Sequence, residues 1–407
     1  MSRQNLKQWL HPKRPVGTTL FGLEHTRMLL EDVFGEDLHL ARVRSLSNGV
    51  AGVLNASMAS VAAIGRAYAG IAGIKSKSGI KQVDRLLSND GVPIDEVMPL
   101  WVKHVVGATE SITVAMDWTD FDDDDHTTLC VSLITTHGRA TPLAWRTVKK
   151  SEIKRMRTGH ELDMVRSMRS WLPSGTRVEW LADRAFGYQE LYELLSSFGW
   201  DYTIRFRENI LVSSGDGRAI PASAHVPANG RVCKLLNPAV TNQRMKIPAA
   251  VFVKSKGMKE AWCLAVSRGE RDGRESVRVY SRRFTIEETF RDTKDITFGL
   301  GLRATHIRDA NRRDRLLLLI AIAQSLLTLL GSASEACGLD RTLKANTVKR
   351  RTMSLLNQGL YWYGCLGRPT MRQEWVDSLL GAYEQILRQH RFLAQILLFE
   401  PSENLEK

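Results

Sequence analysis

The segment SITVAMDWTDFDDDDHTTLCVSLITTHGRATPLAWRTVK, residues 111–149, determines the fold class that we expect for this chain. Its first part, SITVAMDWTDF, is rich in β-branched residues and alternates in polarity, which is typical of a β-strand. The acidic run DDDDH then predicts a turn, and the rest predicts two strands on either side of THGR. Three consecutive strands are therefore expected from about residue 110.

Helices and strands alternate after this segment. SEIKRMRTGHELDMVRSMRSWL, residues 151–172, predicts a long helix that starts with Ser and Glu. TRVEWLADRAFG then predicts a strand that runs into a turn, YQELYELLSSFG a helix and WDYTIRFRE a fifth strand. The order of three strands, helix, strand, helix, strand indicates an α/β fold.

The remaining sequence suggests several further units. Short β segments broken by Gly, Pro and Asn fill 208–272, and helices resume at about residue 281. About 65 residues are too many for a simple loop, so we expect this insertion to pack as a unit of its own. The expected domains are a helical DNA-binding domain (1–105), a core in two parts (106–207 and 273–302), the β-rich insertion (208–272) and a helical C-terminal region (303–407), for which only the family resemblance given below suggests dimer contacts. For the N-terminal helices, a plain helical bundle fits the pattern as well as a DNA-binding module does.

The composition indicates a folded protein with an anionic partner. Hydrophobic residues make up 43% of the chain and charged residues 25%, which excludes a disordered protein. The net charge of +13 favours nucleic acid as the partner, with a membrane surface second.

Cysteines and apolar segments bear on the compartment. The five cysteines are scattered and form no CxxC pair, which argues against a disulfide framework or a zinc ribbon and fits a reducing cytoplasm. No secretory leader is recognisable, so we expect a cytoplasmic protein. LLLLIAIAQSLLTLL, residues 316–330, has about 15 residues where a membrane span needs roughly 20. We interpret it as a buried helix.

Three acidic residues stand out from the solvated ones. Asp117 lies within the first strand, and Asp183 ends the apolar strand VEWLAD. If those strands are neighbours, both carboxylates point into one crevice, and a helix packed across it brings Glu287 to join them. Three carboxylates repel one another unless cations hold them, and oxygen ligands favour magnesium or manganese over zinc. Two such ions, about 3.5–4 Å apart, support phosphodiester cleavage.

Each acid also has a simpler interpretation. Asp117 fits a strand-end turn, Asp183 fits a helix cap and Glu287 fits a solvated helix position. Asp120 with Asp122–Asp125 forms a rival metal cluster, although four adjacent acids before a hairpin are usually a solvated turn.

A second pattern lies in YSRRFTIEETFRDTK, residues 280–294. On one continuous helix, Tyr280, Arg283, Glu287 and Lys294 fall within a stripe about 60° wide. A helix that packs on a core normally places Leu and Val on such a stripe, so four polar residues there indicate a polar ligand.

These residues resemble the Y-R-E-K signature of DDE transposases of the insertion-sequence-four family, which includes the transposase of transposon five. AMDWTDF is similar to the strand of the family's first aspartate, LADRAFG to that of the second and TIEETF to the segment around the glutamate. Ala185 departs from the pattern, since many relatives have Gly there.

The resemblance implies an RNase-H-like core, a mixed five-stranded sheet with helices, interrupted by a β insertion. It implies that Asp117, Asp183 and Glu287 are catalytic and bind two Mg²⁺ ions, for which Mn²⁺ substitutes. Other residues are expected to contact DNA: Tyr280, Arg283 and Lys294 at the phosphates, Trp262 by stacking on a flipped base, and Arg205 and Arg207 at the end of the fifth strand. A core Trp on a β-strand is an equally good interpretation of Trp262.

The function that we expect is cut-and-paste transposition of an insertion sequence. The protein would bind terminal inverted repeats, pair them as a homodimer, cleave double-stranded DNA and join the 3′-hydroxyl ends to target DNA, with no role for a membrane. Two alternatives stay open: an RNase-H-like metal-dependent nuclease without strand transfer, and a non-catalytic DNA-binding regulator of transposition.

Overall fold

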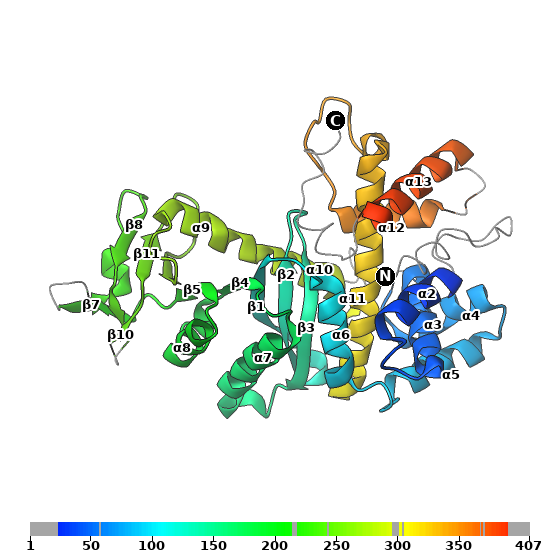
Figure 1. Ribbon diagram of the computed structural model, residues 1–407, viewed down its shortest axis with the longest axis horizontal. Helices are drawn as coiled ribbons and strands as arrows, with labels where there is room; N and C mark the ends of the chain where they lie inside the picture. Colours follow the sequence, from blue (N-terminus) through cyan, green and yellow to red (C-terminus); the bar gives the residue numbers. More distant parts are fainter. Residues whose placement is uncertain are drawn as a thin grey trace.

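Among the described residues, eight strands form the central sheet, in the order β3-β2-β1-β4-β5-β12-β11-β8 (Figure 1). The computed structural model describes residues 23–56, 58–213, 218–241, 244–294, 301–302, 305–366, 368 and 371–389. The ends of the predicted terminal domains, 1–22 and 390–407, lie outside the described residues. The strands are β1 (Ser111–Phe121), β2 (His126–Ile134), β3 (Ala140–Lys149), β4 (Arg177–Ala182), β5 (Asp201–Phe206), β8 (Cys233–Leu236), β11 (Ala249–Val253) and β12 (Trp262–Val266).

The first five strands form the RNase-H-like core that was expected. β1, β2 and β3 pair antiparallel, and β4 and β5 continue the sheet in parallel with β1. The two crossovers contain α7 (Arg157–Trp171) and α8 (Gln189–Ser197), so the predicted element order is confirmed. The helix predicted from residue 151 begins later, because a 3₁₀ turn at Ile153–Arg155 comes first.

The insertion does not pack as a unit of its own, and that expectation is wrong. β12 pairs antiparallel with β5, and β11 and β8 follow it, so three strands of the insertion extend the core sheet. The pairing of β12 with β5 removes the open edge that β5 would otherwise present, and β11, the next strand, is buried along its whole length. The other strands form a small separate sheet: β6 (Leu211–Ser213), β7 (Ala219–Pro221), β9 (Ala239–Val240) and β10 (Met245–Lys246).

Helices resume earlier than predicted. α9 (Gly273–Ser281) begins where Asp272 caps it by accepting from the amides of Arg274 and Glu275. A 3₁₀ turn at Arg282–Phe284 joins α9 to α10 (Thr285–Lys294). The predicted single helix over 280–294 is therefore two helices with a tighter turn between them.

One long helix, α11 (Ala310–Ala336), joins the sheet to the terminal helices (Figure 1). It is the one described helix long and apolar enough to cross a membrane, and 89% of its most apolar 18-residue window is buried within the protein. Its burial agrees with the expected core helix, because β3, N-terminal helices and C-terminal helices all pack against it. These helices are α2 (Leu23–Phe34), α3 (Leu40–Ala56), α4 (Val61–Ala72), α5 (Ser76–Leu87), α6 (Ile94–Val106), α12 (Leu355–Cys365) and α13 (Gln373–Gln389).

Two glycines bring α11 and α12 into backbone contact. A Cβ atom at Gly359 would lie 1.8 Å from the carbonyl oxygen of Leu327, and one at Gly331 would lie 1.9 Å from that of Leu355. A side chain at either position would push the helices apart.

We predict that Gly359→Ala lowers the free energy of unfolding by about 3 kcal/mol, the upper end for an overpacked site. The matched control is Gly381→Ala in α13, where a Cβ meets no atom within 4 Å. Because Ala is the better helix former, this control should raise stability by about 1 kcal/mol. Thermal unfolding followed by circular dichroism measures both. Equal shifts in the two variants would contradict the close helix contact.

Candidate active site

The pairing of β1 with β4 places two of the predicted acids side by side. Met116 lies opposite Ala182 in the parallel register, so Asp117 and Asp183 come next at the same end of the sheet. Asp183 also accepts a hydrogen bond from the Arg184 amide and caps the short turn after β4. The interpretation of Asp183 as a cap is therefore correct. The cap is compatible with a place beside Asp117, because Asp183 still lies at the same end of the sheet.

Glu287 joins this end of the sheet from the first turn of α10. The adjacent Ile286 is fully buried in a small apolar cluster with Ala115 of β1 and Leu181 of β4. This packing lays α10 across the two strands that carry the aspartates. Glu287 itself stays half-exposed, with 48% of its side chain accessible.

A buried arginine connects the carboxylates. Arg283 donates from Nη1 to Asp117 Oδ2 at 3.0 Å and from Nη2 to Glu287 Oε1 at 2.6 Å. Its side chain is only 4% exposed, so these two acids are the counter-ions that make its burial tolerable. The guanidinium thus lies where two of the three carboxylates face each other.

Asp117 is an unusually basic carboxylate. Burial raises its pKa to about 6; Arg283 opposes this rise, and the negative charges of Asp183 and Glu287 add to it. Its Oδ1 accepts from the Trp118 amide at 2.8 Å. The group therefore lies in a desolvated, mutually repelling set of acids that attracts positive charge.

An aromatic cluster borders Arg283. The Trp262 ring packs edge-on against Tyr280 at 4.9 Å between centroids and stacks on Phe284 at 5.7 Å. Tyr280 is fully buried, and burial raises its pKa to about 12, an effect that the Arg283 guanidinium opposes. Phe284, which the sequence interpretation did not select, is 39% exposed, with Arg283 4.7 Å from its ring centroid.

Lys294 is set apart from the other members of the signature. Its Nζ donates to the backbone carbonyl of Asp120 at 2.5 Å and lies 4.5 Å from the centre of the Phe121 ring. Tyr280, Arg283 and Glu287 contact one another or share neighbours, whereas Lys294 lies near the far end of β1.

Arg205 and Arg207 differ in environment. Arg205 donates to Glu260 and to the Ala261 carbonyl, and its side chain is 11% exposed. Arg207 is exposed just after β5. A phosphate contact through Arg205 would therefore compete with Glu260, whereas Arg207 is accessible.

The acidic run after β1 has partners of its own. Lys150 bridges Asp120 and Asp122, Ser151 donates to Asp125, and the buried Arg313 pairs with Asp124. The rival metal cluster is therefore neutralised by side chains from other segments. The acidic run forms a turn, as expected, but only some of its side chains are exposed to solvent: Asp122 is exposed, whereas Asp124 is buried.

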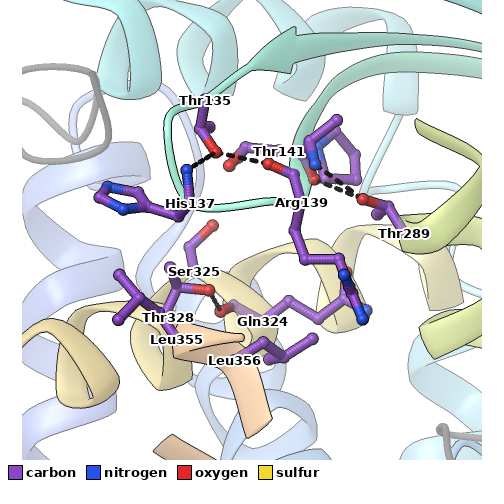
Figure 2. Close-up of a pocket in the computed structure, with 12 residues that line it drawn as sticks. Thr135, His137, Arg139, Thr141, Thr289, Gln324, Ser325, Thr328, Leu355 and Leu356 are labelled. Carbon is purple, nitrogen blue, oxygen red and sulfur yellow. Dashed lines mark hydrogen bonds between the residues drawn. The ribbon is translucent and has the colours of Figure 1, made fainter. Parts of the chain in front are cut away.

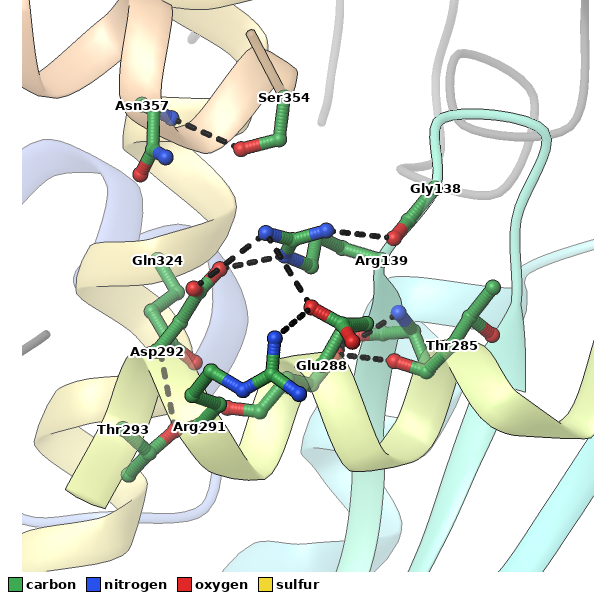
Figure 3. Close-up of polar contacts among 12 residues, drawn as sticks. Gly138, Arg139, Thr285, Glu288, Arg291, Asp292, Thr293, Gln324, Ser354 and Asn357 are labelled. Carbon is green, nitrogen blue, oxygen red and sulfur yellow. Dashed lines mark hydrogen bonds and ion pairs between the residues drawn. The ribbon is translucent and has the colours of Figure 1, made fainter. Parts of the chain in front are cut away.

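The β2–β3 hairpin fixes the position of α10 (Figures 2 and 3). The Thr289 hydroxyl accepts from the Ala140 amide at 2.8 Å and lies 2.9 Å from the Ala140 carbonyl, to which it donates. Arg139 pairs with Asp292 at 2.5 Å and lies 3.9 Å from Glu288. These contacts all follow Glu287 along α10, and they hold the helix in its place over the sheet.

Glu161 of α7 holds together the two chain segments that follow the aspartates, as the hairpin contacts hold α10. This buried carboxylate of α7 accepts from the Trp118 indole at 2.7 Å and from the Tyr188 hydroxyl at 2.8 Å, so it links the segments that follow Asp117 and Asp183. Burial raises the pKa of Glu161. The sequence interpretation missed it, although its spacing to Met164, Val165 and Met168 places it on the buried face of α7.

The three acids suit a hard divalent cation by type, because all of them offer carboxylate oxygens. Within the described residues, however, no group of three acidic, His or Cys side chains converges closely enough to hold one ion. Arg283 occupies two of the carboxylates in this arrangement. Coordination by all three therefore requires that Arg283 release them.

Comparison with protein families agrees with this geometry. A family model described as "Transposase DDE domain" matches residues 134–326. This segment, just under half of the chain, is therefore similar to the DDE domain of transposases. The matched segment includes Asp183 and Glu287, whereas Asp117 lies before its start. A comparison with curated proteins found no match. This similarity supports a transposase function in general; proteins of the matched family act on DNA and normally use divalent metal ions.

We predict that Thr289→Val destabilises the protein by about 1–3 kcal/mol, because the Ala140 amide and carbonyl lose a buried partner. The control is Thr109→Val, which removes a buried hydroxyl that has no hydrogen-bond partner among the described residues. Urea unfolding measures both changes. Similar losses in the two variants would mean that Thr289 does not anchor α10.

We also predict a pH-dependent stability that originates at Asp117. Its folded-state pKa of about 6 lies above the ordinary 3.8, so the folded protein binds the proton more tightly than the unfolded chain does. The contribution is full at low pH and is lost as the pH rises from about 4 to about 6, by up to about 3 kcal/mol.

Asp117→Asn cannot titrate but keeps an oxygen that accepts from Arg283. The variant should match the wild type near pH 4 and exceed its thermal midpoint near pH 7.5, measured with EDTA present. Asp163→Asn, at an exposed position of α7, controls for the lost charge. A constant difference across this pH range would contradict the prediction.

Proposed function

We propose that the protein is a cut-and-paste DNA transposase of the insertion-sequence-four type. The observation that carries this proposal is the meeting of Asp117, Asp183 and Glu287 at one end of the β1–β4 pair, in a chain that is similar to the DDE domain of transposases over residues 134–326. The Y-R-E-K spacing of Tyr280, Arg283, Glu287 and Lys294 supports the finer assignment.

In this proposal the three carboxylates bind two divalent cations, Mg²⁺ or Mn²⁺. Such ions supply an activated water or 3′-hydroxyl and stabilise the leaving oxygen in phosphodiester cleavage. The chain itself contributes the placement of the acids: Ile286 and Thr289 fix α10, and Glu161 fixes the segments after β1 and β4.

Arg283 has a second role once DNA is bound. A phosphate oxygen is a strong acceptor for a guanidinium and competes with the carboxylates for it. When Arg283 turns to a phosphate, Asp117 and Glu287 become available as ligands. Tyr280, Lys294 and the accessible Arg207 are the further phosphate contacts in this proposal, Arg205 contributes after release from Glu260, and Trp262 stacks on an unpaired base beside Phe284.

The wider activity follows from this chemistry. The protein binds the terminal inverted repeats of its own element, pairs two ends as a homodimer, cleaves both strands and joins the freed 3′-hydroxyls to target DNA. The C-terminal helices α12 and α13 are the proposed dimer contacts, and the cytoplasm is the proposed compartment.

The test uses linear duplex DNA that carries the repeats flanking the gene, with Mg²⁺ or Mn²⁺. Wild type should cleave at the repeat boundary and join the ends to a plasmid, whereas Asp117→Asn and Glu287→Gln should lose cleavage by at least about a thousandfold and keep binding. The charge-matched control Asp163→Asn should retain activity.

Other outcomes point elsewhere. Metal-dependent cleavage without joining would identify a nuclease. Binding to the repeats without any cleavage by the wild type would identify a regulator of transposition.

A further inference from the structure

Two N-terminal helices form a compact pair with a short turn. α4 ends at Ala72 and α5 begins at Ser76, so three residues connect them. Gly73 closes α4 in the left-handed conformation, with φ of 65°. A three-residue turn that contains Gly is typical of a helix-turn-helix unit.

The two helices cross in backbone contact. A Cβ atom at Gly65 would lie 2.4 Å from the Cα of Ile80, and one at Gly79 would lie 2.2 Å from the carbonyl oxygen of Gly65. Because no side chain separates them here, α4 fixes the direction of α5. The buried residues of α5 are Gly79, Val83, Leu86 and Leu87, which form one face of the helix.

The opposite face of α5 is exposed and basic. Lys77, Lys81, Gln82 and Arg85 are all exposed, and Lys75 precedes them at the N-cap. Asp84 is the acid of this helix, and it pairs with Arg312 at 2.7 Å. The accessible charge of the face is therefore positive, which complements a polyanion.

The C-terminal end of α5 is fixed to α11. Arg315 donates to the Leu87 carbonyl at 2.9 Å and to the Val92 carbonyl at 3.0 Å, and Arg312 also contacts Ser88. These cations satisfy the end of the helix and match its dipole. The N-terminal half of α5 is held by α4 on its inner face, and its outer face, with Lys77 and Lys81, is accessible to a ligand.

We propose that α4 and α5 are a helix-turn-helix unit and that α5 enters the major groove of double-stranded DNA, where Lys77, Lys81 and Gln82 contact base edges. In helix-turn-helix proteins the N-terminal residues of the second helix contact the bases, and here those residues are the exposed, basic ones. The proposal rests on the proposed function only in taking duplex DNA as the partner.

Helix α5 and the sheet that carries the candidate active site then both pack against α11. α11 holds the end of α5 and also packs on β3, the strand against which α10 is fixed through Ala140. Recognition of a repeat therefore positions the DNA relative to the carboxylates through a rigid connection.

The experiment begins with a pool of duplexes that have a random central segment, from which the full-length wild type selects its preferred sequence. Fluorescence anisotropy at one fixed salt concentration then gives the Kd for the selected duplex and for a scrambled one. Lys77→Ala and Gln82→Ala should reduce the ratio of the two Kd values about 5- to 100-fold. The control Arg177→Ala, an exposed cation at the opposite end of β4 from Asp183, should leave the ratio unchanged.

A second measurement identifies the groove. Replacing single purines of the selected site by their 7-deaza analogues removes the major-groove N7 acceptor. At the position that Gln82 reads, this replacement should weaken the wild type and have no further effect on Gln82→Ala.

Three results would overturn the inference. A selected site bound equally by wild type and α5 variants would exclude α5 as the reader and leave the proposed transposase intact. Insensitivity to every 7-deaza replacement would exclude the major groove. A wild type that selects no sequence would also remove the repeat-binding part of the proposed function.

Discussion

Mutual repulsion among Asp117, Asp183 and Glu287 is the constraint on which the candidate active site depends. The parallel β1–β4 register and the packing of Ile286 bring the three acids together without reducing their charge. Arg283 offsets part of that charge by binding two of them, at the expense of burying its own guanidinium. Arg283 is buried and Asp117 is largely buried, so each needs the other as a partner, because an unpaired buried charge costs several kcal/mol.

The same constraint explains why so much structure surrounds one glutamate. Glu287 lies in the first turn of a helix, where small shifts would separate it from strands β1 and β4. Thr289 binds the backbone of β3, and Asp292 binds Arg139 of the β2–β3 hairpin, so α10 is held by the sheet itself. Rigid support of this kind is what a site for metal-assisted chemistry requires.

The sequence predicted the features that depend on local patterns. The strand that contains Asp117 alternates in polarity, and the strand that precedes Asp183 is apolar. The spacing of Tyr280, Arg283 and Glu287 predicted that the three lie near one another, as they do. The pairing of β12 with β5 was missed, because nothing in the segment 208–272 specifies a distant partner strand. The links made by Glu161 and Thr289 were missed for a similar reason: their helical spacing indicates burial, but not the groups that they meet.

The burial of α11 affects how fragments of this protein would behave, because the helix is covered by segments from both ends of the chain. Leu319 packs next to Gly49 of α3, and Leu327 lies against Gly359 of α12, so the helix is covered by segments from both ends of the chain. A proteolytic fragment that lacks either end would expose a long apolar surface to water. The matched segment 134–326 is recognisable as a separate stretch of sequence, but its part of α11 is covered by helices that lie outside the match.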